Sequence, residues 1–385
     1  MIPYGRQTIN EDDIQAVVDV LRSDLITQGP LVPAFEQGLC AATSAHYAVA
    51  VNSATSALHI ACRALSLGPG DWLWTTPISF VASANCALYC GAQVDFVDID
   101  PSTYSLCPKA LRTKLEAARR DNCLPKIVVP VHMCGHSCDM QAIYQLAQEY
   151  DFRIIEDASH AIGGYYQDSP VGCCQYSDIT VFSFHPVKII TTGEGGAALT
   201  NNPELAKNLQ LLRNHGITRD PNLLTQSPDG PWCYEQQQLG HNYRLTDLQA
   251  ALGLSQLQRL TAVIHTRQQL ADSYHKLLGS LPVVLPQQKM GVVSAYHLYV
   301  IRLPNADRLA IYKKLTAAGI GVNVHYIPIY KQPYYQALGF SNYYCPEAEN
   351  YYREALTLPL FPGLAAEQQA FIASQLKEAL VVDGV

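Results

Sequence analysis

The stretch 178-DITVFSFHPVKIITTGEGGAALT-200 contains two short apolar runs that are joined by a turn rich in glycine. Runs of this length that are apolar on both faces are typical of strands buried inside a sheet. Lys188 follows the first run and lies between apolar residues, and the glycine-rich turn carries a single glutamate, Glu194. The stretch therefore predicts two buried strands, with an ammonium group just past the end of the first.

The alternation of apolar runs and helical patterns extends over the first 215 residues. The predicted strands lie at 46–53, 71–76, 93–100, 126–131, 152–157, 178–184 and 196–200. Helical patterns lie at 11–23, 54–65, 79–91, 108–120, 139–150 and 203–215. Buried strands separated by helices indicate an α/β fold with a mainly parallel seven-stranded sheet, covered by helices on both sides. In such sheets, ligands bind at the carboxyl ends of the strands.

The pattern then changes. Thr246 and Gln249 form a capping box at the start of one long helical pattern that runs from 246 to 279. The remaining elements are expected as a strand, two helices and a segment that is either strand or loop, at 296–303, 305–319, 369–380 and 320–330. We predict a large α/β domain with an N-terminal arm over 1–245, and a linking helix with a smaller α+β C-terminal domain over 246–385.

Composition and charge argue against several classes of function. The 385-residue chain has 33 acidic and 26 basic residues and a net charge of −7, which disfavours nucleic-acid and anionic-membrane partners. No signal peptide is evident at the start, and no run reaches the ~18 apolar residues that a membrane-spanning helix needs. Twelve cysteines scattered along the chain fit a reducing compartment, so we expect a cytoplasmic protein.

The segment 132-HMCGHSC-138 contains four side chains of the types that bind zinc: His132, Cys134, His136 and Cys138. Zinc is one interpretation of this cluster, and a loop that follows a buried strand is the other. The spacing matches none of the usual zinc patterns, so we favour the loop and expect no metal.

Lys188 also has two interpretations. A lysine in an apolar setting loses hydration, which lowers the pKa of its amine and makes a nucleophile available near neutral pH. Alternatively, the side chain reaches past its neighbours to water. Glu156 and Asp157 end an apolar strand, and a carboxylate there is able to hold a protonated ring nitrogen, as pyridoxal phosphate requires. An acidic strand end or helix cap is by itself the commoner interpretation of these two acids.

A phosphate site is the third element of such chemistry. A predicted strand ends just before 54-ATSAL-58, where the free N–H groups and dipole of a starting helix suit an anion, with the hydroxyls of Thr55 and Ser56 as further donors. Simple N-capping explains this junction equally well. Ser183 is another candidate donor, and Phe80 either covers a planar ring or packs in the core. Together these groups form the set that pyridoxal phosphate needs, each near the end of a different strand.

Seven motifs resemble the DegT/StrS-type sugar-nucleotide aminotransferases, and the resemblance covers nearly the whole chain. They are NSATSAL (52–58), TPISFVAS (76–83), EDASHAIGG (156–164), SFHPVKIITTGEGG (183–196), RNHGI (213–217), HNYRLTDLQAALGLSQL (241–257) and VHYIPIY (324–330). The resemblance implies an aspartate-aminotransferase-like structure of fold type I with pyridoxal 5′-phosphate as cofactor. The segments MIPYGRQTI (1–9) and LITQGP (25–30) are most similar to the branch of pseudaminic acid synthesis.

The resemblance also implies roles for individual residues. Lys188 would carry the Schiff base and transfer protons, and Asp157 would hold the pyridine nitrogen. Phe80 would stack on the cofactor ring, and His160 would face the ring 3-oxygen, where many relatives have glutamine. The cofactor phosphate would be bound by Ala54, Thr55 and Ser183, and by Asn242 of a partner subunit. The nucleotide-sugar pocket would be lined by Tyr4, Asp24, Leu25, Ile26, Thr27, His185, Arg244, Asn323, Val324, His325, Tyr326 and Tyr335. Arg244 suits a diphosphate, because a guanidinium forms paired charge-assisted hydrogen bonds.

The implied reaction moves the amino group of L-glutamate to the cofactor and then to carbon 4 of a UDP-4-keto-6-deoxy-N-acetylhexosamine. The enzyme would be a homodimer with an active site shared across the interface, which the long aperiodic segment 218–243 would cross. Three alternatives stay open: a GDP- or dTDP-linked keto sugar, amination at carbon 3, and a non-catalytic regulatory homologue. Related dehydratases have histidine in place of the lysine, so Lys188 argues against that activity.

Overall fold

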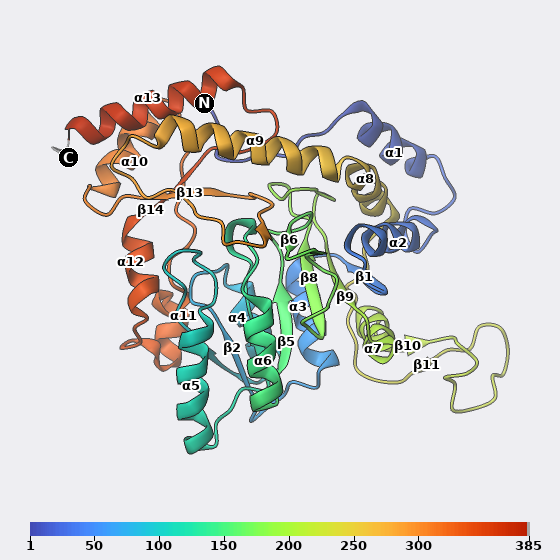
Figure 1. Ribbon diagram of the computed structural model, residues 1–385. Helices are drawn as coiled ribbons and strands as arrows, with labels where there is room; N and C mark the ends of the chain where they lie inside the picture. Colours follow the sequence, from blue (N-terminus) through green and yellow to red (C-terminus); the bar gives the residue numbers. More distant parts are fainter. Residues whose placement is uncertain (383–385) are drawn as a thin grey trace.

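A seven-stranded sheet forms the centre of the structure, a computed structural model that describes residues 1–382 (Figure 1). The strand order is β1-β9-β8-β5-β4-β2-β3. The strands are β1 Tyr47–Val51, β2 Trp72–Thr75, β3 Gln93–Phe96, β4 Ile127–Val129, β5 Arg153–Asp157, β8 Ile179–Ser183 and β9 Gly196–Thr200. Each one coincides with a predicted run, so the prediction of a mainly parallel seven-stranded sheet is confirmed.

One strand of the sheet runs against the others. β9 is antiparallel to both of its neighbours, β1 and β8, with Phe182 opposite Ala197 and Val51 opposite Gly196. The strands from β8 to β3 are parallel to one another. The chain therefore leaves β8 at the carboxyl edge of the parallel strands and turns back at that edge into β9, which places Lys188 where ligands of parallel sheets bind.

Helices cover both faces of the sheet, as predicted. They are α2 Leu31–Thr43, α3 Ala54–Ala64, α4 Ala82–Tyr89, α5 Pro108–Asp121, α6 Met140–Tyr150 and α7 Pro203–Arg213. Side chains of α3, α4 and α7 share one apolar cluster with Val49, Leu73 and Val181 of the sheet. On the other face, α2, α5 and α6 pack against alternate strand residues such as Trp74 and Phe182. This division follows from the two-residue period of a strand.

The prediction of one continuous helix over 246–279 is wrong. The Thr246–Gln249 capping box is present, but the segment forms two helices, α8 Asp247–Gln258 and α9 Leu260–Leu278, which meet at Arg259. The guanidinium of Arg259 binds the carboxylate of Asp13, which is fully buried and belongs to helix α1, Glu11–Leu21. Helix α8 packs against α1 and α2. The direction of the chain changes at Arg259, where the contact with Asp13 of α1 is made.

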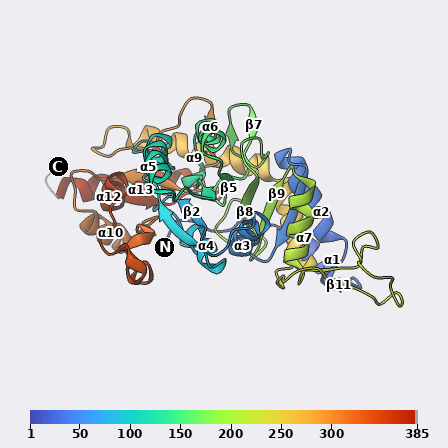
Figure 2. The ribbon, with the colours of Figure 1, turned by 90° about the horizontal axis from the view of Figure 1, so that it is seen from below.

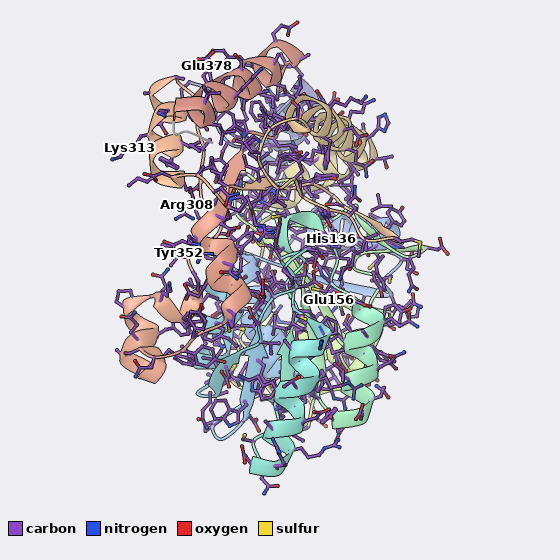
Figure 3. The ribbon with its side chains drawn as sticks, turned by 60° about the vertical axis from the view of Figure 1, so that its left-hand side comes forward. His136, Glu156, Arg308, Lys313, Tyr352 and Glu378 are labelled. Carbon is purple, nitrogen blue, oxygen red and sulfur yellow. The ribbon has the colours of Figure 1, made fainter. Side chains whose placement is uncertain are left out.

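The C-terminal lobe is built around a pair of antiparallel strands. Its elements are β13 Tyr299–Arg302, α10 Arg308–Ala317, α11 Pro333–Tyr335, α12 Pro346–Glu354, β14 Ala355–Leu358 and α13 Ala366–Val382. Figure 3 shows α10 beside α12, where the guanidinium of Arg308 lies 5.0 Å from the ring centre of Tyr352. The chain start also joins this lobe, because Ile2 pairs with Ile320. The division at residue 245 stays a prediction.

The segment 218–243 projects from the body near α7, and Figure 2 shows it extended away from the sheet. Its ends pair as β10 Ile217–Thr218 and β11 Glu235–Gln236, and Trp232, Tyr234 and Leu239 are exposed on it. The other short elements are β6 Tyr165–Tyr166, β7 Ser169–Pro170, β12 Val292–Val293, the 3-10 turns Met133–Gly135 and Ile329–Lys331, and the π-turn Gln336–Phe340. Within residues 1–382, no helix combines the length and apolarity that crossing a membrane requires.

Candidate active site

A cavity of about 560 Å³ lies at the carboxyl edge of the sheet. It brings together thirteen of the predicted site residues: Tyr4, Ala54, Thr55, Phe80, Asp157, His160, Ser183, His185, Lys188, Asn323, Val324, His325 and Tyr326. They come from the chain start, the start of α3, the ends of β5 and β8, and the segment before α11. The carboxyl ends of adjacent parallel strands meet at one edge, which explains why residues so distant in sequence converge.

Asp157 is buried at the end of β5 and is held from two sides. The hydroxyl of Ser83 donates a hydrogen bond of 2.6 Å to Oδ2, and the backbone N–H of Ser159 donates one of 3.2 Å to Oδ1. Ser83 in turn lies 2.7 Å from the hydroxyl of Ser79. These bonds set the orientation of an ionised carboxylate at the cavity wall, as a partner for a protonated ring nitrogen requires.

Lys188 also lines this cavity, and its side chain is only partly exposed. Burial lowers the pKa of its amine from 10.5 to about 8, although the attraction of Asp157 opposes the change. Burial favours the first of the two sequence interpretations, because a larger share of this partly exposed amine is neutral near physiological pH than in an ordinary lysine. The amine of Lys188 and the carboxylate of Asp157 thus line the same cavity.

The start of α3 supplies an anion site. Ser53 caps the helix, and its hydroxyl accepts a hydrogen bond of 3.1 Å from the N–H of Ser56. The hydroxyl of Ser56 donates to Asn52, so this side chain serves the cap and not the cavity. The N–H groups of Ala54 and Thr55 lie in the first turn and have no acceptor among the described residues. A phosphate group fits this end of the cavity, because such free donors and the helix dipole attract anions.

Three buried histidines surround the amine on one side: His160, His297 and His325. Burial and the charge of Lys188 lower the pKa of each, to about 4 for His325 and well below the usual value for the other two. All three imidazoles are therefore neutral at physiological pH. The rings of His160 and His297 lie 4.4 Å apart, and Nδ1 of each is buried without a partner among the described residues. An unpaired imidazole nitrogen at this wall fits a ring oxygen of the cofactor.

Aromatic side chains complete the cavity. Phe80 keeps 60% of its surface exposed, and its ring centre lies 6.5 Å from that of Tyr326. The hydroxyl of Tyr326 lies 3.4 Å from Nε2 of His160. A largely uncovered Phe80 beside the cavity leaves a ring face free for a planar cofactor. Anion donors, carboxylate, amine and aromatic face thus all fit pyridoxal phosphate, and these groups would hold it.

Seven predicted residues lie outside this cavity, and their roles stay predictions. Asn242 is exposed and pairs with Asn214, and Arg244 donates a 2.6 Å hydrogen bond to the side chain of Asn214. The residues Asp24, Leu25, Ile26 and Thr27 form a segment that pairs with the start of α8. Tyr335 is buried in the core, where its hydroxyl donates to Asn85.

Sequence reasoning missed six polar residues of the cavity: Ser53, Ser79, Ser83, Ser159, Glu194 and His297. A signal existed for Ser83, since Ser79 and Ser83 are four residues apart at the start of a predicted helix, just after a predicted strand. Glu194 was noted but received no role. No local pattern marks His297, because its position depends on the packing of segment 294–298 against the loop at Gly135.

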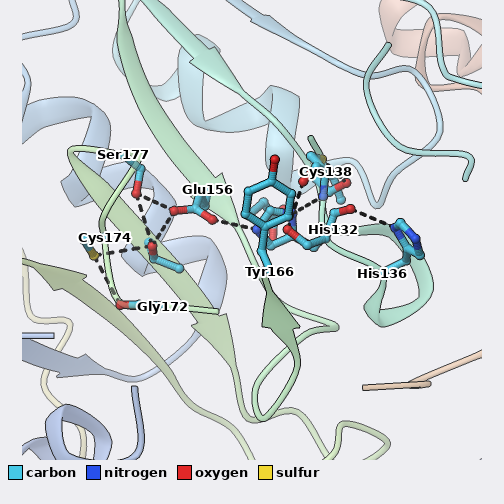
Figure 4. Close-up of polar contacts among 12 residues, drawn as sticks. His132, His136, Cys138, Glu156, Tyr166, Gly172, Cys174 and Ser177 are labelled. Carbon is cyan, nitrogen blue, oxygen red and sulfur yellow. Dashed lines mark hydrogen bonds and ion pairs between the residues drawn. The ribbon is translucent and has the colours of Figure 1, made fainter. Parts of the chain in front are cut away.

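The cysteine and histidine segment 132–138 forms a hydrogen-bonded loop, shown in Figure 4. Nε2 of His132 donates to Glu156 at 2.7 Å, and its Nδ1 accepts from the N–H of Cys138. The thiol of Cys138 donates to the carbonyl of Val131, and Nδ1 of His136 donates to that of Ser137. Among residues 1–382, no group of three or more histidines, cysteines or acids is arranged to hold a metal ion.

Comparisons with known proteins agree with this geometry. The sequence pattern of the DegT/DnrJ/EryC1/StrS aminotransferase family matches residues 7–377. A UDP-4-amino-4,6-dideoxy-N-acetyl-beta-L-altrosamine transaminase from Campylobacter jejuni is 36% identical, and the match covers 98% of this chain and 96% of that protein. Helicobacter pylori PseC, an aminotransferase involved in the biosynthesis of pseudoaminic acid, is 32% identical, with a TM-score of 0.91 and 99% of both chains covered.

A third relative was solved with cofactor. The PLP form of the putative sugar aminotransferase Spr1654 from Streptococcus pneumoniae is 31% identical, with a TM-score of 0.89 and 100% of both chains covered. These matches extend over the lobes, the cavity and the turn that carries Lys188. The chain therefore belongs to the DegT/DnrJ/EryC1/StrS aminotransferase family and is a pyridoxal 5′-phosphate-dependent aminotransferase.

Proposed function

We propose that the enzyme transfers the amino group of L-glutamate to carbon 4 of a UDP-linked 4-keto-6-deoxy-N-acetylhexosamine, in the synthesis of a pseudaminic-acid-type sugar. The observation that carries the chemistry is the cavity in which Lys188 and Asp157 lie together beside the free start of α3. The sugar class is supported by the C. jejuni transaminase, which is named for such a UDP-sugar, and by H. pylori PseC.

Asp157 orients and charges the cofactor. When bound, pyridoxal phosphate supplies a ring that takes up the electron pair left on carbon when a proton departs. This ring needs a protonated nitrogen, and the buried carboxylate of Asp157 would pair with that nitrogen and keep it protonated. Ser83 and Ser159 occupy one oxygen each, so the carboxylate cannot rotate away. The N–H groups of Ala54 and Thr55, with the hydroxyl of Ser183, would bind the phosphate.

Lys188 moves the proton. With a pKa of about 8, about a tenth of the amine is neutral at pH 7, against roughly 0.03% for an ordinary lysine. A neutral amine accepts the proton from the carbon of the amino donor and returns one to carbon 4 of the sugar in the second half of the reaction. The lowered pKa values of His160, His297 and His325 make these imidazoles weaker bases than the amine of Lys188, so they do not take up this proton.

We also propose a homodimer in which Asn242 contacts the cofactor phosphate of the partner subunit. Asn242 is exposed and lies outside the cavity of its own chain. The adjacent projecting segment carries exposed Trp232 and Leu239, which an interface would cover. Arg244 lines a second cavity of about 780 Å³ together with Lys207 and other basic residues, a setting suited to the diphosphate of a nucleotide sugar.

Turnover of a panel of 4-keto sugars tests the proposal. Purified enzyme is given L-glutamate and UDP-, dTDP- or GDP-linked 4-keto-6-deoxy sugars, and both 2-oxoglutarate and the amino sugar are quantified. The UDP-linked N-acetylated sugar should give a kcat/KM at least about 10-fold above the others, because a recognised group contributes 1.4 kcal/mol or more. Lys188→Ala should be inactive with every sugar.

Three results would change the conclusion. Faster turnover of a GDP- or dTDP-linked sugar would replace the proposed substrate with that alternative. An amino group found at carbon 3 would refute the proposed position of transfer. Turnover of none of these sugars by wild-type enzyme that has bound its cofactor would refute the proposed substrate class.

A further inference from the structure

Glu194 is a second carboxylate at the wall of the reactive cavity. Among the described residues that line this cavity, Asp157 and Glu194 are the two acids. Asp157 is occupied by Ser83 and Ser159, whereas the carboxylate of Glu194 has a single neighbour, Nε2 of His185, at 3.9 Å. The side chain of Glu194 is 62% exposed and that of His185 50%. Glu194 therefore presents unused hydrogen-bond acceptors to whatever enters.

The backbone that carries Glu194 is tightly held. Its carbonyl accepts hydrogen bonds of 2.7 Å from the hydroxyl of Thr192 and from the side chain of Gln249 in α8. Gly193 has a positive φ of 78°, which favours glycine. A methyl group on Gly196 would lie 2.4 Å from the backbone nitrogen of Ala54 in α3. The glycines thus allow the turn to lie against α3, and this packing fixes where the backbone of Glu194 lies relative to Lys188.

The two substrates of the proposed reaction differ in the charge and the hydrogen-bonding groups that they bring to the carboxylate of Glu194. L-glutamate carries two carboxylates, whereas the ring of a keto hexosamine is uncharged and offers O–H and N–H donors. An ionised carboxylate accepts strong hydrogen bonds from such donors, and it repels another carboxylate at short range. No guanidinium lines this cavity among the described residues, and the amine of Lys188 is the cation that shares it with Glu194.

We propose that Glu194 is a specificity-determining residue, which accepts a hydrogen bond from a hydroxyl or amide N–H of the sugar ring and disfavours anionic substrates at the same place. The imidazole Nε2 of His185 lies 3.9 Å from this carboxylate. This inference rests on the proposed sugar substrate and adds the residue that distinguishes the two half-reactions. It predicts that the charge of Glu194 favours the sugar half-reaction and does not assist the glutamate half-reaction.

The test compares the two half-reactions in holoenzyme of wild type, Glu194→Gln and Glu194→Asp. Each half-reaction is followed separately as a single turnover, through the change in cofactor absorbance on adding L-glutamate or the UDP-4-keto sugar. The matched control is Glu116→Gln, which removes an exposed carboxylate from α5, away from the cavity. Calorimetric binding of UDP-N-acetylglucosamine, a UDP-sugar without a keto group, gives a readout that requires no turnover.

The expected result is selective. Glu194→Gln should lose about 10- to 100-fold in the rate constant over KM of the sugar half-reaction, the usual effect of removing a charged hydrogen-bond partner. Its glutamate half-reaction should be equal to wild type or faster. Binding of UDP-N-acetylglucosamine should weaken, Glu194→Asp should retain more of the sugar reaction than Glu194→Gln, and Glu116→Gln should match wild type.

Other outcomes overturn the inference. Equal losses in both half-reactions would assign Glu194 to proton transfer or to the structure of the turn, and an unchanged sugar half-reaction would leave it as a solvated turn residue. If Glu194→Gln does not fold, the ratio of the two half-reactions in Glu194→Asp decides. If wild type aminates none of the sugars, the proposed function fails, while probe binding and the glutamate half-reaction still test the charge of Glu194.

Discussion

Replacing Lys188 by methionine should stabilise the cofactor-free protein near neutral pH, although it abolishes transamination. Methionine keeps a long unbranched chain but carries no charge, so it removes the cost of holding an ammonium group in the cavity wall. Burial lowers the pKa of this amine from 10.5 to about 8, against the attraction of Asp157. The lysine in the cavity wall therefore lowers the stability of the folded protein.

The magnitude follows from this difference in pKa. A difference of about 2.5 corresponds to about 3.4 kcal/mol, and because Lys188 is partly exposed we expect a gain of about 1–3 kcal/mol in the free energy of unfolding. Between the two pKa values the unfolded chain binds a proton that the folded chain does not, so wild-type stability rises with pH there. The advantage of Lys188→Met is therefore full below about pH 8 and disappears towards pH 10.5.

Thermal unfolding of the two apoproteins at pH 7 and at about pH 9.5 measures this effect. We expect Lys188→Met to melt several degrees above wild type at pH 7, at about 2–4 °C per kcal/mol, and the difference to shrink at the higher pH. Lys109→Met, on the exposed face of α5, controls for the loss of a surface charge. A variant that is no more stable at pH 7, or that gains equally at both pH values, would refute the reasoning.

Three further predictions concern the surroundings of the site. Ser83→Ala removes the 2.6 Å hydrogen bond to Asp157 and should weaken cofactor binding about 10- to 100-fold in an absorbance titration; unchanged affinity would show that the hydroxyl does not set the carboxylate. Glu156→Gln replaces the ionised acceptor of the His132 Nε2–H by a neutral amide and should cost about 1–3 kcal/mol of stability at pH 7 by chemical denaturation. Burial alone would raise the pKa of Glu156, but His132 and neighbouring hydroxyls hold it below the usual value, so wild-type stability falls on acidification through this pKa and the variant should lose less; parallel acid profiles would contradict this. Asn242→Ala should weaken cofactor binding in the dimer while the mass measured by light scattering stays constant, and wild-type monomers obtained by dilution should bind cofactor equally weakly.

The strands of the sheet were predictable because their signal is local. Seven short apolar runs separated by helical patterns are visible along the chain, and each became a strand of the central sheet. Helix α2 was missed, since Pro33 and Gly38 interrupt its pattern. In the fold these residues cause no break: the proline lies in the first turn, and Gly38 allows Leu257 of α8 to approach. The break at Arg259 was missed for a related reason, because its partner Asp13 lies 246 residues away.

The sequence by itself determined the class of fold and the edge of the sheet at which the candidate groups lie. Apolar periodicity is repeated within a few residues of each element, Asp157 ends one buried strand, and Lys188 lies five residues past the end of another, at the edge where ligands of a parallel sheet bind. Only the tertiary structure decided how those groups are held. Ser83 reaches Asp157 across 74 residues, and Glu194 and His297 enter the cavity through packing against other segments. Such contacts depend on which distant surfaces meet when the core is buried, and no pattern along one stretch of chain records that choice.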